Sequence, residues 1–490
     1  MPSSWRSVVT AAAAGVLVLS AASCGSSGSA GEDWRLPNFD AASTRSAPTS
    51  TIDRESAHTL HVVWTYRLGR PTGESGAMTA TPVTADGMVF VQDMASNVVA
   101  LDRSSGAVRW RHLFRARNGG PNGLAVADNT VYGATDTSAF ALSAGSGKLL
   151  WRRTLVRRGE PFVDVAPLVA GSTVYLSTIG VPPNGKGAVY SLDARTGAVR
   201  WKRSTIAEPW RVPTEAGGGG AWYPPSVGGG SVYVGTANPY PYGGTRRYPN
   251  GAAYAGPALY TDSLLVLDRA DGSIRWYDQV TRHDVRDYDF QLSPILGPSG
   301  ATPAVFGAGK AGTVIAWNRR TRRRLWQVDV GVHAHDLGPL PTKPTAVCPG
   351  LLGGVETPMA LAGGALFVPV VNLCTRGSAY GYEPLERIDP SAGTGELVAL
   401  DAASGRRLWG RRLPQPDFGC ATVANGVVFT STFDGRLYGL DTRDGTTLWR
   451  HRMPAGVNAC PAVSGDLLIV AAGVPGVGRN ALEVAAFGSG

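Results

Sequence analysis

The sequence predicts an all-β protein made of many short strands that reverse direction often. Among its 490 residues are 64 glycines and 34 prolines, and no collagen-like period accounts for them. Such residues are needed where a chain turns many times. With 43% hydrophobic and 17% charged residues, the composition is that of a globular protein and not of a disordered chain. The third observation, a short recurring motif, indicates how the strands are organised.

A thirteen-residue motif recurs seven times at fixed internal spacing. It begins with apolar residues followed by Leu and Asp, and it continues with three variable positions, Gly, three further positions and Trp. The tryptophan follows the leucine position by nine residues in every copy. The copies occupy residues 98–110, 139–151, 189–201, 264–276, 314–326, 397–409 and 437–449. Ser143 replaces the Asp in the second copy, and Asn318 and Arg322 replace the Asp and the Gly in the fifth.

Each copy of this motif predicts a β-hairpin. A strand ends at the Asp, whose carboxylate accepts backbone N–H groups two or three residues further on and closes the turn. The Gly supplies the positive φ that the turn requires. The following strand then carries the Trp, which packs against a neighbouring sheet.

Further hairpins precede several copies, so the repeating unit is a four-stranded antiparallel sheet. They are predicted at residues 81–93, 124–135, 226–236 and 421–432. Because a radial arrangement of such sheets leaves only short, protected edges, we expect a β-propeller. Trp64 marks an eighth copy that lacks its preceding strand, and residues 482–487 form a strand that lacks its following Trp. Joining the two closes the ring, which predicts an eight-bladed β-propeller over residues 51–490.

The N-terminal residues predict export and lipid anchoring. Residues 1–23 have the pattern of a signal peptide, whose apolar run is too short to span a bilayer of ~30 Å. The residues before Cys24 are similar to a bacterial lipobox without its usual Leu, so Cys24 is the expected lipidation site, and ordinary secretion is the alternative. Residues 24–50 are expected to hold the lipidated Cys24, a flexible tether and the lead-in to the first blade. The expected location is therefore extracytoplasmic, anchored to the cell membrane.

The net charge of +9 comes mostly from scattered arginines. Such a charge suits weak attraction to an anionic lipid surface or to an acidic ligand. No nucleic-acid-binding motif accompanies it, so nucleic acid is not an expected partner. The arginines at positions 319, 320, 322, 323 and 324 are expected to form a solvated corner of one blade.

The motif copies resemble the tryptophan-docking repeats of the pyrroloquinoline-quinone (PQQ)-dependent alcohol dehydrogenases, and the resemblance covers roughly residues 35–487. Loop segments outside the motif follow in the order of that family. They are GGGGAWYPPSV (217–227), GTANP (235–239), YTDSLLVLD (260–268), TRHDVRDYDF (281–290), GKAGTVIAW (309–317), CPGLLGGVE (348–356) and LFVPVVNLC (366–374).

The resemblance implies a PQQ site with a calcium or lanthanide ion in the central funnel. Trp222 matches the residue that stacks on PQQ, Asn238 matches a metal ligand, and Lys310 matches the cationic residue beside the quinone oxygens. Asp287 matches the general base, and Asp289 falls where some members carry an extra carboxylate. The implied catalytic residues are Asp287 and Lys310, and the implied metal ligands are Asn238, Asp287 and Asp289.

The sequence also departs from the family at several site positions. A metal-binding Glu is replaced near Pro182, and a second Glu that contacts PQQ is replaced by Thr79. Asn122 stands where an Arg pairs a PQQ carboxylate, and Arg286 replaces a Trp beside the base. The loss of the Glu leaves few hard oxygen ligands for calcium. Lys186, Lys310 and Arg286 then suggest a cationic site in place of a metal-centred one.

Apart from Cys24, the chain has four cysteines, an even number that suits disulfides in an oxidising compartment. The resemblance implies the pair Cys348–Cys374, because the matching family region often carries both cysteines. Cys420 and Cys460 occupy similar places in successive blades, so neighbouring strands are expected to bring their sulfurs together.

Two functions from different classes remain open. The first is a PQQ-type dehydrogenase of alcohols, polymeric alcohols or sugars that passes electrons to a separate acceptor. The second is a non-catalytic propeller that binds a protein or ligand at the cell envelope, as propeller lipoproteins of outer-membrane protein assembly do. Asp287 and Asp289 could simply close a loop, Trp222 could pack between blades, and His283 is expected to be structural.

Overall fold

The computed structural model describes residues 33–69, 77–116, 118–157, 162–163, 165–180, 185–207, 217–252, 256–474 and 481–489. The predicted signal peptide, Cys24, the Gly/Ser tether and Pro182 lie outside the described residues. Residues Gly31–Gly490 form one structural unit. Within the described ranges, no helix has the length and apolar character needed to cross a membrane.

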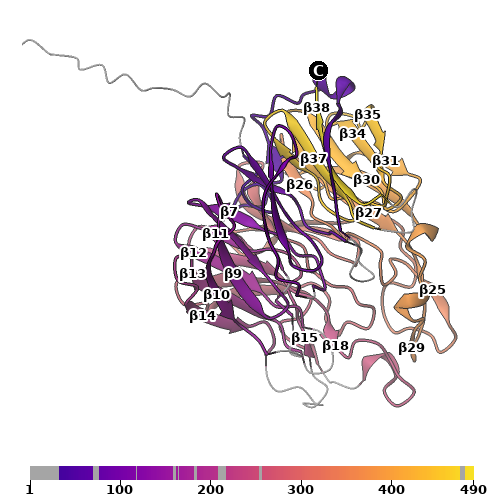
Figure 1. Ribbon diagram of the computed structural model, residues 1–490. Coiled ribbons are helices and arrows are strands. Elements are labelled where there is room, and N and C mark those ends of the chain that lie inside the picture. The colour runs from indigo at the N-terminus through magenta and orange to yellow at the C-terminus, as the bar shows by residue number, and fades with distance from the viewer. Residues whose placement is uncertain are drawn as a thin grey trace, which may run out of the picture. The chain divides into compact units, whose positions relative to one another are not determined.

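Antiparallel sheets make up almost all regular structure in the described chain, which confirms the all-β fold class (Figure 1). Four short 3-10 turns are the helical elements there: η1 (Ser56–Thr59), η2 (Pro249–Gly251), η3 (Leu385–Arg387) and η4 (Pro390–Ala392). Two small sheets also occur within these ranges. One pairs β15 (Gly217–Gly218) with β18 (Pro239–Tyr240), and the other contains β25 (Thr345–Val347), β28 (Thr375–Ser378) and β29 (Gly381–Tyr382).

Eight larger sheets contain the predicted hairpins, and in each of the first four the strands follow chain order across the sheet. The first sheet comprises β3 (Val83–Ala85), β4 (Met88–Gln92), β5 (Val98–Asp102) and β6 (Val108–His112). The second comprises β7 (Ala125–Ala127), β8 (Thr130–Ala134), β9 (Ser138–Ser143) and β10 (Leu149–Thr154). The third comprises β11 (Leu168–Ala170), β12 (Thr173–Ser177), β13 (Ala188–Asp193) and β14 (Val199–Ser204). The fourth comprises β16 (Ser226–Gly228), β17 (Ser231–Gly235), β19 (Ser263–Asp268) and β20 (Ile274–Gln279).

The fifth to seventh sheets keep the four strands of the repeat in chain order, whereas the eighth places the early strand β2 beside the last three strands and so joins the two ends of the described chain. The fifth comprises β21 (Ile295–Ser299), β22 (Thr302–Gly307), β23 (Thr313–Asn318) and β24 (Arg324–Asp329). The sixth comprises β26 (Ala360–Ala362), β27 (Ala365–Asn372), β30 (Thr394–Asp401) and β31 (Arg407–Leu413). The seventh comprises β32 (Thr422–Ala424), β33 (Val427–Ser431), β34 (Arg436–Asp441) and β35 (Thr447–Arg452), with β1 (Ser46–Ala47) parallel to β32. The eighth comprises β36 (Ala462–Ser464), β37 (Leu467–Ala472), β38 (Glu483–Gly488) and β2 (His61–Arg67).

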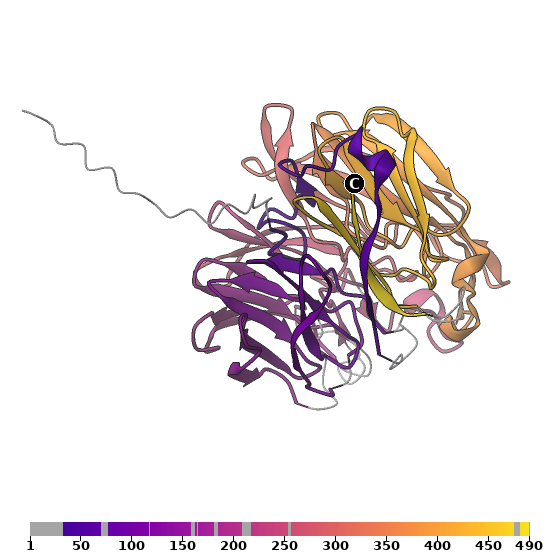
Figure 2. The same ribbon diagram turned by 45° about the horizontal axis from the view of Figure 1, so that its top comes forward.

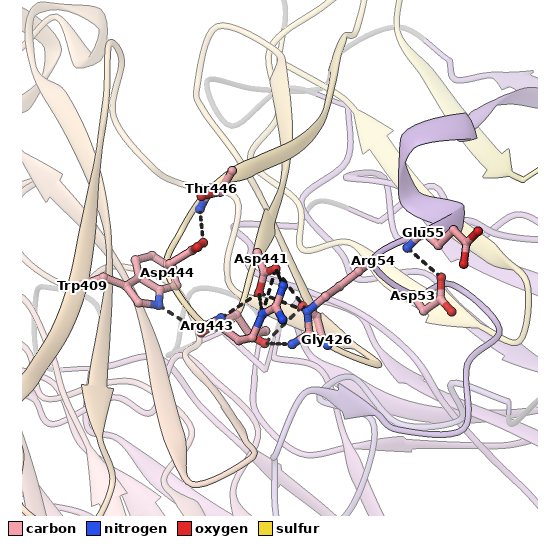
Figure 3. A network of polar contacts seen from close by, with 10 residues as sticks. Asp53, Arg54, Glu55, Trp409, Gly426, Asp441, Arg443, Asp444 and Thr446 are labelled. Carbon is pink, nitrogen blue, oxygen red and sulfur yellow. Dashed lines mark hydrogen bonds and ion pairs between the residues drawn. The ribbon is translucent and has the colours of Figure 1, made fainter.

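In the eighth sheet, β2 pairs antiparallel with β38, from His61 opposite Gly488 to Arg67 opposite Glu483. Figures 1 and 2 both show this early strand beside the C-terminal strands. Arg54, seven residues before β2, adds an ion pair with Asp441 of β34, at 3.1 Å between Nε and Oδ1 (Figure 3). Arg443 binds the same carboxylate at 2.6 Å, so one aspartate of the motif ties together two segments distant in sequence.

Tryptophans of the motif link successive sheets. Just before the tryptophan, the pairing of the two outer strands shifts by one residue. Such a β-bulge changes the direction in which the following side chain points. The indole Nε1 then donates at 2.7–3.1 Å to a backbone carbonyl of the next sheet, which lies in a motif turn in six cases and at Leu60, directly before β2, in the seventh. The donor and acceptor residues are Trp64 and Arg103, Trp110 and Ala144, Trp151 and Ala194, Trp201 and Arg269, Trp326 and Ala402, Trp409 and Thr442, and Trp449 and Leu60.

The motif glycine lies directly under the indole of the preceding sheet. Gly147 has φ +69°, and a Cβ added to it would lie 2.5 Å from the ring of Trp110. The same residue therefore provides both the left-handed turn and the space for the neighbouring tryptophan. Gly106, Gly197, Gly272, Gly405 and Gly445 have the same conformation and the same contact.

The lead-in segment, residues 33–50, is packed against the inner edges of the sheets. Its carbonyl oxygens accept N–H groups from the first strands of six sheets, at 2.8–2.9 Å. This segment therefore satisfies donors that an inner edge strand would otherwise leave unpaired. The carbonyl and N–H residues are Trp34 and Thr84, Arg35 and Val126, Ala41 and Val227, Ala42 and Leu296, Thr44 and Leu361, and Arg45 and Val423.

Arg45 is the most buried charged side chain of this segment, with 0% exposure. All five of its N–H donors bind neutral oxygens. Nε binds Ala421 O at 2.8 Å, Nη1 binds Pro37 O and Asn38 Oδ1, and Nη2 binds Thr422 Oγ1 and Pro461 O. The sequence does not mark Arg45, because it belongs to no repeat. Its side chain connects the lead-in to loops near the C-terminal end of the chain.

Both predicted disulfides are present and are therefore confirmed. The Cα atoms of Cys348 and Cys374 are 4.5 Å apart, and those of Cys420 and Cys460 are 5.2 Å apart. Cys420 precedes β32 and Cys460 precedes β36, so this disulfide joins the entry loops of two successive sheets.

Replacing Gly147 with alanine should lower the free energy of unfolding by about 2 kcal/mol or more, because the added Cβ meets the Trp110 ring and φ is positive. Gly145, two residues earlier in the same turn, has no atom within 4 Å of an added Cβ. Gly145→Ala should therefore change the stability by less than about 0.5 kcal/mol. Chemical denaturation of the two variants measures this difference, and equal losses would contradict the docking role of Gly147.

Replacing Arg45 with methionine should destabilise the protein by about 3 kcal/mol or more, since several buried carbonyl groups lose their donor. Arg195→Met, at an exposed turn, is the matched control and should leave the melting temperature nearly unchanged. Thermal denaturation followed by circular dichroism compares them. A neutral effect of Arg45→Met would show that the lead-in contributes little to stability.

Candidate functional site

Lys310 lies at the centre of a buried group of charged side chains. It belongs to the loop between β22 and β23, and its Nζ lies 2.8 Å from Asp287 Oδ2 and 2.7 Å from Asp289 Oδ2. The three side chains are 11%, 12% and 3% exposed, in that order. Both aspartates come from the loop between β20 and β21. The structure thus brings together three of the predicted site residues, as one ammonium between two carboxylates.

The charges of this cluster are mutually dependent. Burial by itself would lower the pKa of Lys310, but the carboxylates of Asp287 and Asp289 hold it well above its usual value. Burial raises the pKa of Asp287 well above its usual value, and the charge of Lys310 opposes that rise. Lys310 therefore remains protonated at neutral pH. Lys310 donates a hydrogen bond to Asp287 Oδ2 and forms a close ion pair with Asp289 Oδ2.

Glu356 is a further buried acid beside this cluster, and the sequence does not mark it as a site residue. Its Oε2 accepts a hydrogen bond of 3.0 Å from Gln291 Nε2, while Oε1 has no partner in the described structure. Burial raises the pKa of Glu356 to about 7, although Lys310 partly opposes this rise. The one sequence feature that could have indicated Glu356 as a site residue is its place as an acid at the end of an apolar and glycine-rich segment (348–356).

Backbone bonds hold the site loops together. Asp289 Oδ1 accepts the backbone N–H of Asn238 at 2.7 Å, and Asp289 O accepts that of Lys310 at 3.0 Å. The N–H of Ala237 binds Gly220 O at 2.7 Å, so the loop of Trp222 is joined to the loop of Asn238. Next to Trp222, the hydroxyl of Tyr223 donates to Glu356 O at 3.0 Å.

These bonds bring all five predicted site residues into one region of the fold. Asn238, Asp287, Asp289 and Lys310 are linked directly by the contacts above. Trp222 is half-buried and enters the region through its neighbours, Gly220 and Tyr223. The side chains of Asp287, Asp289 and Lys310 are in direct contact, whereas Asn238 and Trp222 are placed near them through backbone bonds of their loops.

The oxygen ligands in this arrangement do not fit a calcium or lanthanide ion. The Oδ2 atoms of both aspartates bind Lys310, so an ammonium occupies the place between them. Asn238 contacts Asp289 through its backbone, and its amide nitrogen donates to Pro239 O at 3.0 Å. Nowhere in the described ranges do three or more His, Cys, Asp or Glu side chains group together so as to hold a metal. Hard cations require more oxygen ligands than one amide supplies.

Two of the positions that depart from the family satisfy each other. The hydroxyl of Thr79 lies 3.3 Å from Asn122 Oδ1, and the amide of Asn122 donates to Asp93 O at 3.0 Å. Arg286 is also occupied, since its guanidinium donates to the carbonyls of His335, Leu337 and Gly338. The substituted residues are therefore hydrogen-bonded to neighbouring groups of the protein.

Two more buried acids surround the cluster. Asp262 is 0% exposed, and neither carboxylate oxygen has a hydrogen-bond partner in the described structure. Burial raises the pKa of Asp262 well above its usual value. Burial also raises the pKa of Asp284 to about 6, although the backbone N–H groups of Arg286 and Tyr288 stabilise its charged form. His283 faces the backbone carbonyls of Gly256 and Asn250, as a structural histidine does.

The disulfide Cys348–Cys374 supports the loop that carries Glu356. Gly350 N donates to Leu373 O at 2.8 Å, and the hydroxyl of Tyr288 donates to Pro349 O at 3.1 Å. Gly354 lies against the backbone of Lys310, where an added Cβ would collide with the lysine carbonyl. The loop positions that hold the charged cluster are thus fixed by close backbone contacts.

Comparison with solved structures defines the fold class as a β-propeller. The chain superposes on a quinohemoprotein alcohol dehydrogenase of Comamonas testosteroni with a TM-score of 0.80 and 23% identity, over 94% of this chain and 81% of the other. A europium-containing methanol dehydrogenase gives 0.79 at 20% identity, over 94% and 98% of the two chains. BamB from Moraxella catarrhalis gives 0.56 at 13% identity, over 87% and 97%.

Residues 34–337 match the family model described as glucose/ethanol/alcohol dehydrogenase, beta-propeller domain, and residues 310–487 match that of outer membrane protein assembly factor BamB. The chain therefore belongs to the PQQ β-propeller family of glucose, ethanol and alcohol dehydrogenases.

Among curated relatives, quinohemoprotein alcohol dehydrogenase ADH IIB of Pseudomonas putida is 28% identical over 53% of this chain and 41% of its own length. The quinohemoprotein alcohol dehydrogenase of Comamonas testosteroni is 25% identical over 82% of this chain and 66% of its own length. The chain thus spans less than two thirds of either relative.

Lys310→Met should lower the free energy of unfolding at pH 7 by about 3–5 kcal/mol, because two buried carboxylates lose their counter-ion and Asp289 keeps only the Asn238 N–H. The loss should shrink as the pH falls. Without Lys310 the folded-state pKa of Asp287 rises further above its unfolded value, so the folded state is favoured at low pH and loses stability as the pH rises. Denaturant unfolding between pH 4 and 8, with exposed Lys148→Met as the control, measures this, and a pH-independent deficit would contradict it.

Proposed function

We propose that this protein is a quinoprotein-type oxidoreductase, which oxidises an alcohol, a polymeric alcohol or a sugar outside the cytoplasmic membrane. The observation that carries the proposal is the buried contact of Lys310 with Asp287 and Asp289. Burying charged groups away from water costs folding free energy, and side chains with strongly shifted pKa values concentrate at functional sites. The relatives that the chain matches are alcohol dehydrogenases, which supports the same class of reaction.

The polar groups present fit the carbonyl edge of a quinone better than they fit a metal ion. The Lys310 ammonium can donate to a carbonyl oxygen, and the unpartnered Oε1 of Glu356, whose pKa is raised to about 7, can do so when that carboxyl is protonated. Lys310 would hold the quinone oxygen of PQQ, and Trp222 would lie against its ring. When bound, PQQ supplies the ortho-quinone that takes up the two electrons and the hydrogen of the alcohol carbon.

The residues of the chain then divide the remaining work. Asp287, whose pKa is raised, accepts the proton of the alcohol hydroxyl while the C–H hydrogen leaves with its electron pair. Asp289 stays hydrogen-bonded to the Asn238 backbone and fixes the position of Lys310. The Lys310 ammonium would supply positive charge beside the quinone oxygen of bound PQQ. In this proposal a separate acceptor receives the electrons.

We further propose that the eight large sheets are the blades of one closed ring. The pairing of β2 with β38, and the bond from Trp449 Nε1 to Leu60 O, support closure between the first and last repeats. Deleting residues 482–490 would then expose the edges of β2 and β37 and cause aggregation. A truncated protein that remains monomeric with an unchanged melting temperature would contradict ring closure.

The proposed location is extracytoplasmic, where lipidation of Cys24 would anchor the chain to the cell membrane. This part of the proposal rests on the sequence of the leader, which lies outside the described residues. Cys24→Ala should release the protein into the soluble fraction, and mass spectrometry of the N-terminal peptide identifies the lipid.

A non-catalytic role in protein binding is the second candidate function. Three observations favour it. The guanidinium of Arg286 is hydrogen-bonded to backbone carbonyls, and Thr79 is hydrogen-bonded to Asn122. Residues 310–487 also match the family model of BamB. Under this proposal the buried acids would be a structural feature inherited with the fold.

Asp287→Asn should abolish dye-linked oxidation of alcohols by PQQ-loaded protein, because the amide cannot accept the proton, while PQQ uptake should remain largely intact. Asp271→Asn, at an exposed turn, is the matched control and should retain full activity. Uptake is followed by absorption and activity by dye reduction. If the unmodified protein takes up no PQQ, the binding role is the better conclusion.

A further inference from the structure

One contact between successive sheets differs from the others because Arg322 replaces the motif glycine. Six glycines at this position lie against the preceding tryptophan, where there is no space for a Cβ. Arg322 has a Cβ and nevertheless keeps the left-handed conformation, with φ 64°. Arg322 therefore leaves less room at this position for the preceding tryptophan, Trp276, than a glycine does.

The hydrogen bonds of the tryptophans reflect this difference. In seven other links the indole donates to a backbone carbonyl of the next unit, and in six of them the acceptor directly follows the Asp position of the motif. The corresponding acceptor for Trp276 is Arg319, and the described structure contains no bond between them. The Trp276 side chain is half-buried, and it lacks the indole hydrogen bond to the next sheet that the other seven tryptophans form.

A cavity of about 320 Å³ lies at this junction. Its walls include Tyr233, Arg275, Trp276, Arg319, Arg320 and Arg322. The cavity is therefore lined by two aromatic rings and four guanidinium groups. Its volume is at the lower end of the range for small-molecule pockets, which is roughly 300–1,000 Å³.

The positive charge of the cavity is largely uncompensated. Arg275 is paired with Asp268, at 2.7 Å between Nη2 and Oδ2. Arg319 donates to the Tyr233 hydroxyl at 3.1 Å and lies over its ring at 5.3 Å, so its side chain is held in place without neutralisation. Among the described residues, Arg319, Arg320 and Arg322 form no ion pair with a carboxylate.

We infer that this cavity binds the phosphate monoester group of a small organic molecule or of a lipid headgroup. Guanidinium groups bind phosphate oxygens in a bidentate manner, and three uncompensated positive charges match a dianionic phosphate. The Trp276 ring provides an apolar wall for the carbon part of the ligand. The expected solvated corner of arginines is thus, in part, a concave anion site, created where a tryptophan loses its docking glycine.

Arg322→Gly tests this inference by restoring the motif. The variant should let Trp276 dock, close the cavity, raise the melting temperature and weaken binding of glycerol 1-phosphate by about tenfold or more. Arg319→Gln should weaken binding to a similar extent without the gain in stability. Arg323→Gln, which removes a neighbouring arginine outside the cavity lining, is the control and should bind normally. Calorimetric titration of the full-length protein measures these affinities.

Two further arms identify the source of the phosphate. Vesicles of phosphatidylcholine with phosphatidic acid are compared with phosphatidylcholine alone, in the same variants. Binding of glycerol 1-phosphate identifies a soluble ligand, and binding of the phosphatidic acid vesicles alone identifies a lipid headgroup; both support the inference if Arg322→Gly removes them. Binding that is unchanged in Arg322→Gly, reduced equally in Arg323→Gln, or absent for both probes would overturn it.

Discussion

The fold depends on the packing of a tryptophan indole ring against a glycine of the neighbouring sheet. At six junctions the tryptophan of one sheet covers the glycine of the next, as Trp110 covers Gly147. The inner strands, such as β3, contain as few as three residues, so their own ladders provide few hydrogen bonds. Burial of a large ring at each junction therefore supplies much of the contact between sheets. One turn position sets both the hairpin and the packing of its neighbour.

A motif that repeats at fixed internal spacing can be recognised in a single sequence. For this reason the sheets were predictable, and so was the disulfide Cys420–Cys460, whose cysteines occupy similar places in successive repeats. Asp287, Asp289 and Lys310 were predictable only through resemblance, because aspartates in turns are common in any β protein. Arg45 and Glu356 carry no periodic signal, and their importance arises from burial. Burial depends on the neighbours that the fold supplies, which a local pattern does not contain.

The candidate site shows how the scaffold maintains unfavourable electrostatics. Four buried acids besides Asp289 have raised pKa values, while Lys310 is the cation in direct contact with two of the cluster's carboxylates. Glycines such as Gly354 allow the loops to approach until backbone meets backbone. The rigid loops prevent the acids from separating, and the energy of their burial is offset by packing elsewhere in the sheets.

The position of the lead-in has a consequence for the order in which the chain acquires its structure. Residues 34–45 leave the ribosome early, yet Arg45 binds oxygens of Ala421, Thr422 and Pro461 near the other end of the chain. These contacts can form only after nearly the whole polypeptide has been synthesised, and contacts of such long sequence separation are slow to form. Until then the inner strand edges have no cover and are open to pairing with other molecules. The newly synthesised chain is thus most open to misassembly just before residues 34–45, which are made early, form these contacts.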